Sequence, residues 1–143
     1  MSTDARAVTA GATLLRLTLG AMYVSHAWFK ITAFGVGGFA GWLDSLGLPG
    51  FMAAPVIALE LAGGVLLLSG FYARYVSVAL LPILAVATWV HAPNGLIFSN
   101  ANGGWEYPVF LMIASVVQAL IGDGSFALKS RPLPFATLRT AQG

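Results

Sequence analysis

Four long apolar stretches constrain this chain more than any other feature of its sequence. They cover about residues 9–31, 53–70, 72–91 and 105–121, and each approaches the roughly 20 residues that a helix needs to cross a hydrocarbon layer of ~30 Å. Four strands could not close a barrel in lipid, whereas a helix satisfies its own backbone hydrogen bonds. The sequence therefore predicts an all-α fold, an integral membrane four-helix bundle. We expect a single membrane domain over residues 1–143, with residues 122–143 as a polar tail.

The composition agrees with a membrane protein and excludes several kinds of chemistry. The chain is 58% hydrophobic and only 8% charged, and its formal net charge of +2 is too small to predict nucleic-acid binding. The absence of cysteine excludes a thiolate nucleophile and thiolate metal ligands from this chain. No two metal-binding side chains have a Glu-x-x-His or His-x-x-x-His spacing, and no haem, flavin or phosphate-loop signature is present. The sequence thus predicts no resident metal.

The basic residues predict an orientation in the membrane. With both termini cytoplasmic, six of the seven basic residues lie at or near the cytoplasmic side, and only Lys30 lies outside. The six are Arg6, Arg16, Arg74, Lys129, Arg131 and Arg139. We therefore expect a multi-pass protein of the bacterial cytoplasmic (inner) membrane, with residues 92–104 and the loop after the first helix facing outward.

Three local features refine the bundle. Phe39, Trp42, Leu43 and Leu46 recur at helical spacing between the first two spans, which predicts a short amphipathic helix in the membrane interface. A disordered glycine-rich linker is the alternative for this segment. Pro82 lies near the middle of the third span, so a kink is expected there. Arg16 is interpreted as a snorkelling anchor.

Each of the four spans carries an ionisable side chain near the predicted outer side. These are His26, Glu60, His91 and Glu106, and ionisable residues within membrane helices are costly and usually functional. His26 and Lys30 are four residues apart and share one helix face. A buried carboxylate would lose its charge without a cationic partner, so we expect Glu60 to contact His26 or Lys30.

A structural interpretation of the same residues stays open. Histidines at helix ends often bond loop carbonyls, and Lys30 could snorkel to the membrane surface. Trp105 and Tyr107 are ordinary residues of an interfacial aromatic belt.

Four ordered motifs resemble those of a known family. They are RLTLGAMYVSHAWFKI, a Gly-Leu-Pro turn, ALELAGGVLLLSGFYAR, and HAPNG paired with NGGWEYP. Together they span roughly residues 12–128 and are similar to the DoxX family of small bacterial membrane proteins. The resemblance implies membrane oxidoreductase systems, including the small subunit of thiosulfate:quinone oxidoreductase in related members. It also implies that the motif positions are His26, Lys30, Glu60, His91, Asn94, Trp105 and Glu106. Ala27 departs from the glycine that commonly follows the histidine, which affects close packing there.

The leading hypothesis is a membrane subunit of a quinone-linked oxidoreductase, with quinone or quinol bound in the outer half of the bundle. Its proton donors would be His26, Glu60, His91 and Glu106, and the ring would lie among Lys30, Trp28, Asn94, Trp105 and Tyr107. Electrons would come from a partner redox protein or a diffusible reductant, and a homo-oligomer is an alternative assembly. The second hypothesis is a non-catalytic anchor or assembly subunit whose polar cluster is structural. A transporter is disfavoured because four helices enclose only a narrow path and no broken-helix repeat is visible.

Overall fold

The computed structural model describes residues 3–132, and every element that it contains there is helical apart from one isolated bridge. The first helix continues through a π-helical segment, Lys30–Phe34, into the second. A short 3₁₀ turn at Gly50–Met52 precedes the third helix, and another at Ala92–Asn94 follows the fifth. The helices are α1 (Thr3–Phe29), α2 (Gly35–Ser45), α3 (Ala53–Ser69), α4 (Ala73–Ala79), α5 (Leu81–His91) and α6 (Glu106–Ile121).

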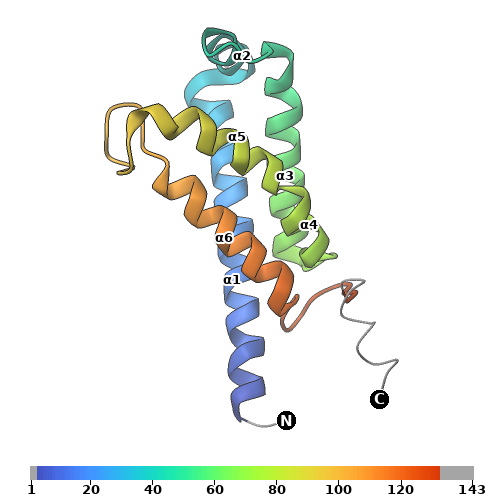
Figure 1. Cartoon of the computed structure of the whole chain (residues 1–143). Helices are drawn as coiled ribbons and strands as arrows, with labels where there is room; N and C mark the ends of the chain where they lie inside the picture. The colour runs from blue at the N-terminus through green and yellow to red at the C-terminus, as the bar shows by residue number, and fades with distance from the viewer. Residues whose placement is uncertain (1–2, 133–143) are drawn as a thin grey trace.

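The expected membrane bundle is confirmed as an all-helical fold. Within the described part of the chain, three helical stretches are long and apolar enough to span, namely Asp4–Ser45, Gly50–Ser69 and Ala73–Asn94. The fourth, Glu106–Ile121, is apolar but only 16 residues long. Figure 1 shows α1 and α3 upright, α5 and α6 side by side across them, and α2 at the end opposite the start of α1. The side of the membrane that each end faces stays a prediction.

The third span is broken where the sequence predicted a kink. Leu80 separates α4 from α5, and Pro82 is the second residue of α5. Proline has no N–H to donate to the preceding turn, and its ring clashes with the carbonyl four residues earlier. The break turns α5 away from α3, as Figure 1 shows.

Close packing of α1 on α3 depends on two glycines. A Cβ on Gly20 would lie 2.9 Å from the carbonyl oxygen of Gly64, and a Cβ on Gly64 would lie 2.9 Å from that of Gly20. Small residues let two membrane helices approach each other through their backbones. This contact fixes the register of α1 against α3. It thereby positions the polar side chains that lie toward the α2 end of both helices.

The segment between the first two spans contains the expected short helix, α2. Phe39 and Leu43 on one face are buried and pack with Ala27, Ala53 and Ile57. Trp42 is 40% exposed, and Leu46 is exposed beyond the helix end. The helix therefore covers the ends of α1 and α3, while its position in a membrane interface stays a prediction.

The interpretation of Arg16 as a snorkelling anchor is wrong. Its side chain is 2% exposed and donates hydrogen bonds to the carbonyl oxygens of Asp123 (2.6 Å) and Ser125 (3.1 Å). Arg74 similarly donates to the carbonyl oxygens of Ala119 and Leu120, at 3.0 and 3.2 Å. Arg16 thus fastens the chain after α6 to the bundle, and Arg74 fastens the last turn of α6. Arg139 and the rest of the expected tail (122–143) from residue 133 onward lie outside the described residues.

Candidate functional site

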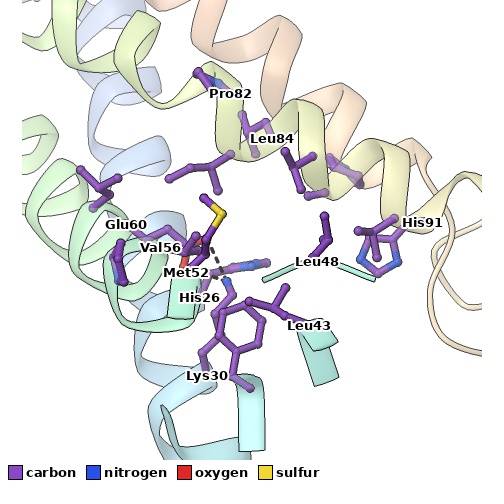
Figure 2. A pocket seen from close by; sticks show the side chains of 18 of the residues that line it. His26, Lys30, Leu43, Leu48, Met52, Val56, Glu60, Pro82, Leu84 and His91 are labelled. Carbon is purple, nitrogen blue, oxygen red and sulfur yellow. Dashed lines mark hydrogen bonds and ion pairs between the residues drawn. The ribbon is translucent and has the colours of Figure 1, made fainter. Parts of the chain in front are cut away.

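A cavity of about 480 Å³ lies between α1, α2, α3, α5 and α6. Its walls are mainly apolar, and each of the four predicted spans contributes at least one polar side chain to its lining. Figure 2 shows His26 from α1, Lys30 from the π-helical segment after it, Glu60 from α3 and His91 from α5 arranged around one space. Ligand sites in proteins are commonly cavities of ~300–1,000 Å³ with few polar groups in an apolar lining.

The first polar pair in the cavity is an ion pair between Lys30 and Glu60. The Lys30 Nζ lies 2.8 Å from Glu60 Oε1 and 2.7 Å from Oε2, and the two side chains are 18% and 6% exposed. The expectation that Glu60 contacts His26 or Lys30 is therefore confirmed for Lys30. An ammonium has three N–H donors, so one remains beyond the two that can serve the carboxylate.

The second polar pair joins α1 to α6. His26 Nε2 lies 3.1 Å from the hydroxyl oxygen of Tyr107, and the two rings are 13° from parallel with centroids 5.5 Å apart. Both side chains line the cavity. We call His26, Lys30, Glu60 and Tyr107 the polar wall. Its two pairs hold groups that can donate, accept or share a proton inside an otherwise apolar space.

Two local features of the chain position the polar wall. Lys30 begins the π-helical segment, which changes the helical register between α1 and α2, and such segments are frequent at functional sites. The returning α2 then places the ring of Phe39 5.7 Å from Lys30 Nζ, a cation–π contact. Phe39 and Trp42 line the cavity with ring centroids 5.7 Å apart.

These two aromatic rings were not predicted as site residues, although the helix that carries them was predicted. Two features of the sequence could have identified them: the length of the connection between the first two spans, and the helical spacing of the apolar residues Phe39 and Leu43. They indicate a helix folded back over the end of α1, where Lys30 lies.

His91 and Asn94 organise the loop between α5 and α6. His91 Nδ1 lies 3.0 Å from the carbonyl oxygen of Asn102, to which Asn94 Nδ2 also donates at 3.1 Å. Asn100 Nδ2 donates to the carbonyl oxygen of Asn94 at 2.9 Å. His91 also lines the cavity, on the far side of the space from Glu60 in Figure 2. Asn94 does not line it.

The structure places the other three expected site residues away from this cavity. Glu106 Oε1 accepts a hydrogen bond from the backbone N–H of Phe98 at 2.8 Å, and Glu106 borders a separate shallow hollow with Phe98. Trp105 precedes α6 without lining the cavity, and its backbone N–H donates to the carbonyl oxygen of Gly95. Trp28 is 65% exposed on another face of α1. Their catalytic or ring-binding roles stay predictions.

Comparison with known proteins identifies the family of this chain. Residues 11–92 match the family model described as DoxX, which is more than half of the chain. The chain belongs to the DoxX family. A DoxX-type relative from Bacillus subtilis (strain 168), named "Putative oxidoreductase CatD", is 36% identical over 118 residues, covering 82% of this chain and 84% of the relative.

A second relative supports a membrane location. "Inner membrane protein YqjF" of Escherichia coli (strain K12) is 28% identical over 127 residues, covering 82% of this chain and 88% of that protein. No solved structure matches the chain. The DoxX family match includes three members of the polar wall, His26, Lys30 and Glu60, and ends before Tyr107. This DoxX-family chain is therefore a membrane protein that has a relative named for redox chemistry.

The described residues of this DoxX-family chain also include no group of three or more His, Cys, Asp or Glu side chains that could hold a metal ion. In the polar wall, Lys30 occupies both carboxylate oxygens of Glu60, and His26 pairs with Tyr107. The arrangement is suited to hydrogen bonding with an organic ligand that carries oxygen acceptors.

Proposed function

We propose that this protein is the membrane subunit of a redox system and binds a quinone or quinol, or a comparable small redox substrate, in the cavity. The observation that carries the proposal is the juxtaposition of the Lys30–Glu60 ion pair with the His26–Tyr107 pair on the wall of a ligand-sized apolar space. The relative named as an oxidoreductase supports the redox class. The family and the inner-membrane relative favour a bacterial inner membrane.

The residues present fit a quinone in size and in chemistry. A cavity of about 480 Å³ can hold a substituted six-membered ring. Phe39 and Trp42 offer aromatic faces beside the space, and the remaining N–H of Lys30 and the Tyr107 hydroxyl are donors suited to carbonyl oxygens. A bound quinone would take up two electrons and two protons on reduction to the quinol.

The chain's own contribution would be to hold and move protons. Glu60 keeps the Lys30 ammonium in place at the wall, and Lys30 Nζ orients an oxygen acceptor. His26 Nε2 and the Tyr107 hydroxyl share one hydrogen bond and can pass a proton between them. Electrons would be supplied by a partner redox protein or by a diffusible reductant.

A second function, a non-catalytic anchor or assembly subunit, is favoured by one specific observation. The Lys30–Glu60 pair joins the π-helical segment after α1 to α3, and the His26–Tyr107 pair joins α1 to α6. Both pairs would then serve to hold the helices together. The redox function predicts that removal of the charges weakens quinone binding. The anchor function predicts that it lowers the stability of the protein.

The deciding experiment removes both charges while the packing volume is kept. Lys30→Met/Glu60→Leu leaves no unpaired charge, and such replacements of a buried pair are often neutral for stability. We expect ubiquinone and menaquinone to co-purify with the parent and to fall at least tenfold in this variant, with an unchanged melting temperature. The matched control, Asp4→Leu/Arg6→Met, removes one acidic and one basic side chain from exposed positions of α1 and should keep the quinone.

The opposite result would favour the anchor function. In that case extraction and mass spectrometry would find the same quinone content in the parent and in Lys30→Met/Glu60→Leu, and only the melting temperature would fall. A parent protein that carries no quinone and binds none when it is added would contradict the quinone proposal directly.

A further inference from the structure

The cavity has an apolar rim formed by two helical elements that face each other. Besides Trp42 and Met52 on the side toward α2, five of its lining residues are solvent-exposed in the isolated chain, namely Pro55, Leu59, Ala79, Pro82 and Val86. The first two of these five belong to α3 and the other three to α4 and α5. We call these five residues the rim. The polar wall is more buried, with Glu60 4% exposed. The cavity therefore has a polar interior and an apolar opening.

The opening follows from the break in the third span. A Cβ on Gly63 would lie 2.8 Å from Leu80 Cδ1, so α3 touches the α4–α5 junction closely at this level. Beyond Leu80, α5 runs away from α3 toward the loop before α6 (Figure 1). The two helices therefore diverge toward α2, and the rim lies in the resulting gap that the cavity occupies.

The rim lies at a depth where lipid is expected. Leu59 is the seventh residue of α3, about 10 Å from the start of the helix at a rise of 1.5 Å per residue. Val86 lies five residues before His91, roughly 7 Å below the loop. Both belong to helical stretches long enough to span the membrane. Hydrocarbon chains, rather than water, would thus meet the rim.

The side of the cavity toward α2 is covered by apolar side chains. Phe39 and Leu43 of α2 are buried and line the cavity, and Leu48 lines it from the turn that follows. A polar, water-soluble ligand would have to pass these residues to reach Lys30 and Glu60. An apolar ligand dissolved in the bilayer would meet only the matching apolar rim.

We propose that the ligand is a lipid-soluble molecule with an oxygen-bearing ring and a long apolar tail, which enters sideways from the bilayer between α3 and α5. The ring contacts the polar wall, and the tail crosses the rim between Leu59 and Val86 into the lipid. This inference rests on the proposed function and specifies its substrate class. It excludes small water-soluble redox compounds as the principal substrate.

The test compares two probes with the same head group in lipid nanodiscs. One is decylubiquinone, and the other is the tail-less 2,3-dimethoxy-5-methyl-1,4-benzoquinone. Binding is read from quenching of Trp42, which lines the cavity, in a background where the other three tryptophans are phenylalanine. That background must retain the melting temperature of the parent.

Blocking the rim should affect only the probe that has a tail. We expect Leu59→Phe/Val86→Phe to weaken decylubiquinone binding at least tenfold and to change binding of the tail-less probe less than twofold. The matched control is Leu120→Phe/Val116→Phe on α6, because these side chains are comparably exposed and line no part of the cavity. It should change neither affinity.

The experiment distinguishes failure of lateral access from failure of the proposed quinone site. If both probes bind the parent and the blocked rim weakens neither, lateral access is wrong and the quinone site stands. Equal weakening of both probes also overturns it, because the substitutions would then act on the head-group site. If neither probe quenches Trp42 in the parent, the proposed function itself is overturned.

Discussion

The two ends of the bundle both contain buried charges, and they use them differently. At the end away from α2, Arg16 and Arg74 donate to backbone carbonyl oxygens of α6 and the segment after it. The backbone N–H of Arg74 also donates to Asp123 Oδ1 at 2.9 Å. We call Arg16, Arg74 and Asp123 the tail-side cluster. At the α2 end, the polar wall pairs side chain with side chain beside a cavity.

The two ends differ more in how closely the charged groups are packed than in how deeply they are buried. A Cβ on Gly122 would lie 2.5 Å from Arg74 Nη2, and one on Gly70 would collide with Arg16 Nη1. Both arginines of the tail-side cluster are therefore packed closely against glycine backbone. Lys30 and Glu60 border a space of about 480 Å³. A buried charge in a membrane bundle thus indicates a ligand site only where space adjoins it.

The largest expected difference between the two ends is the compartment that each faces. The chain has no native cysteine, so single cysteines can be introduced at Ser99 in the exposed loop and at Ser130 after α6. The distribution of basic residues predicts that Ser99→Cys reacts with a membrane-impermeant maleimide in intact cells. Ser130→Cys should react only after lysis. The reverse pattern would show that the polar wall lies near the cytoplasm.

The next largest effect is expected in the tail-side cluster. Arg16→Met would leave the carbonyl oxygens of Asp123 and Ser125 without their charged donor, so we expect a loss of about 3 kcal/mol in the free energy of unfolding. Unfolding by SDS in mixed micelles measures this value. Arg6→Met, at an exposed position of the same helix, is the control and should stay within about 0.5 kcal/mol. A loss below about 1 kcal/mol for Arg16→Met would remove the structural role of this cluster.

Much of the bundle could be predicted because its causes are local. The length of the apolar stretches predicted the spans, and Pro82 predicted the break that the structure shows at Leu80. The partner of Glu60 followed from electrostatics alone, because a buried carboxylate needs a cation and Lys30 was one of two candidates. The partners of Arg16 could not be found in this way. They are backbone carbonyls more than 100 positions later in the chain, and backbone groups leave no signal in a sequence.

The same physics explains which of the predicted aromatic and acidic residues lie away from the cavity. Trp28 is two residues from His26, and residues two apart point to different faces of a helix. Its exposure was therefore predictable, whereas the approach of Trp42 depends on how α2 folds back. At the start of α6, Glu106 and Tyr107 differ by one position, about 100° of helix rotation. Only packing of α6 on α1 decides that Tyr107 faces the cavity.

A smaller loss of stability is expected when one charge of the polar wall is removed. Glu60→Gln leaves the Lys30 ammonium without its anion, but the glutamine amide oxygen can still accept a hydrogen bond from Lys30 Nζ, and Lys30 is 18% exposed. We expect a loss of about 1–2 kcal/mol, below the roughly 3–5 kcal/mol typical of a fully desolvated pair. The measurement is the same SDS unfolding. A loss equal to that of Arg16→Met would break the contrast between the two ends.

The smallest effect is expected at Glu106, and it tests how far the site extends. Glu106→Gln keeps an amide oxygen that can accept from the Phe98 N–H, and only the charge-assisted part of that hydrogen bond is lost. We expect at most about 0.5 kcal/mol of destabilisation for this exposed bond and less than a twofold change in decylubiquinone binding. Tyr107→Phe is the neighbouring comparison and should weaken binding several-fold, because the hydroxyl faces the cavity and pairs with His26. A tenfold loss of binding in Glu106→Gln would instead support the proton-donating role that the sequence predicted for Glu106, and the site would then include the loop from Ala92 to Trp105.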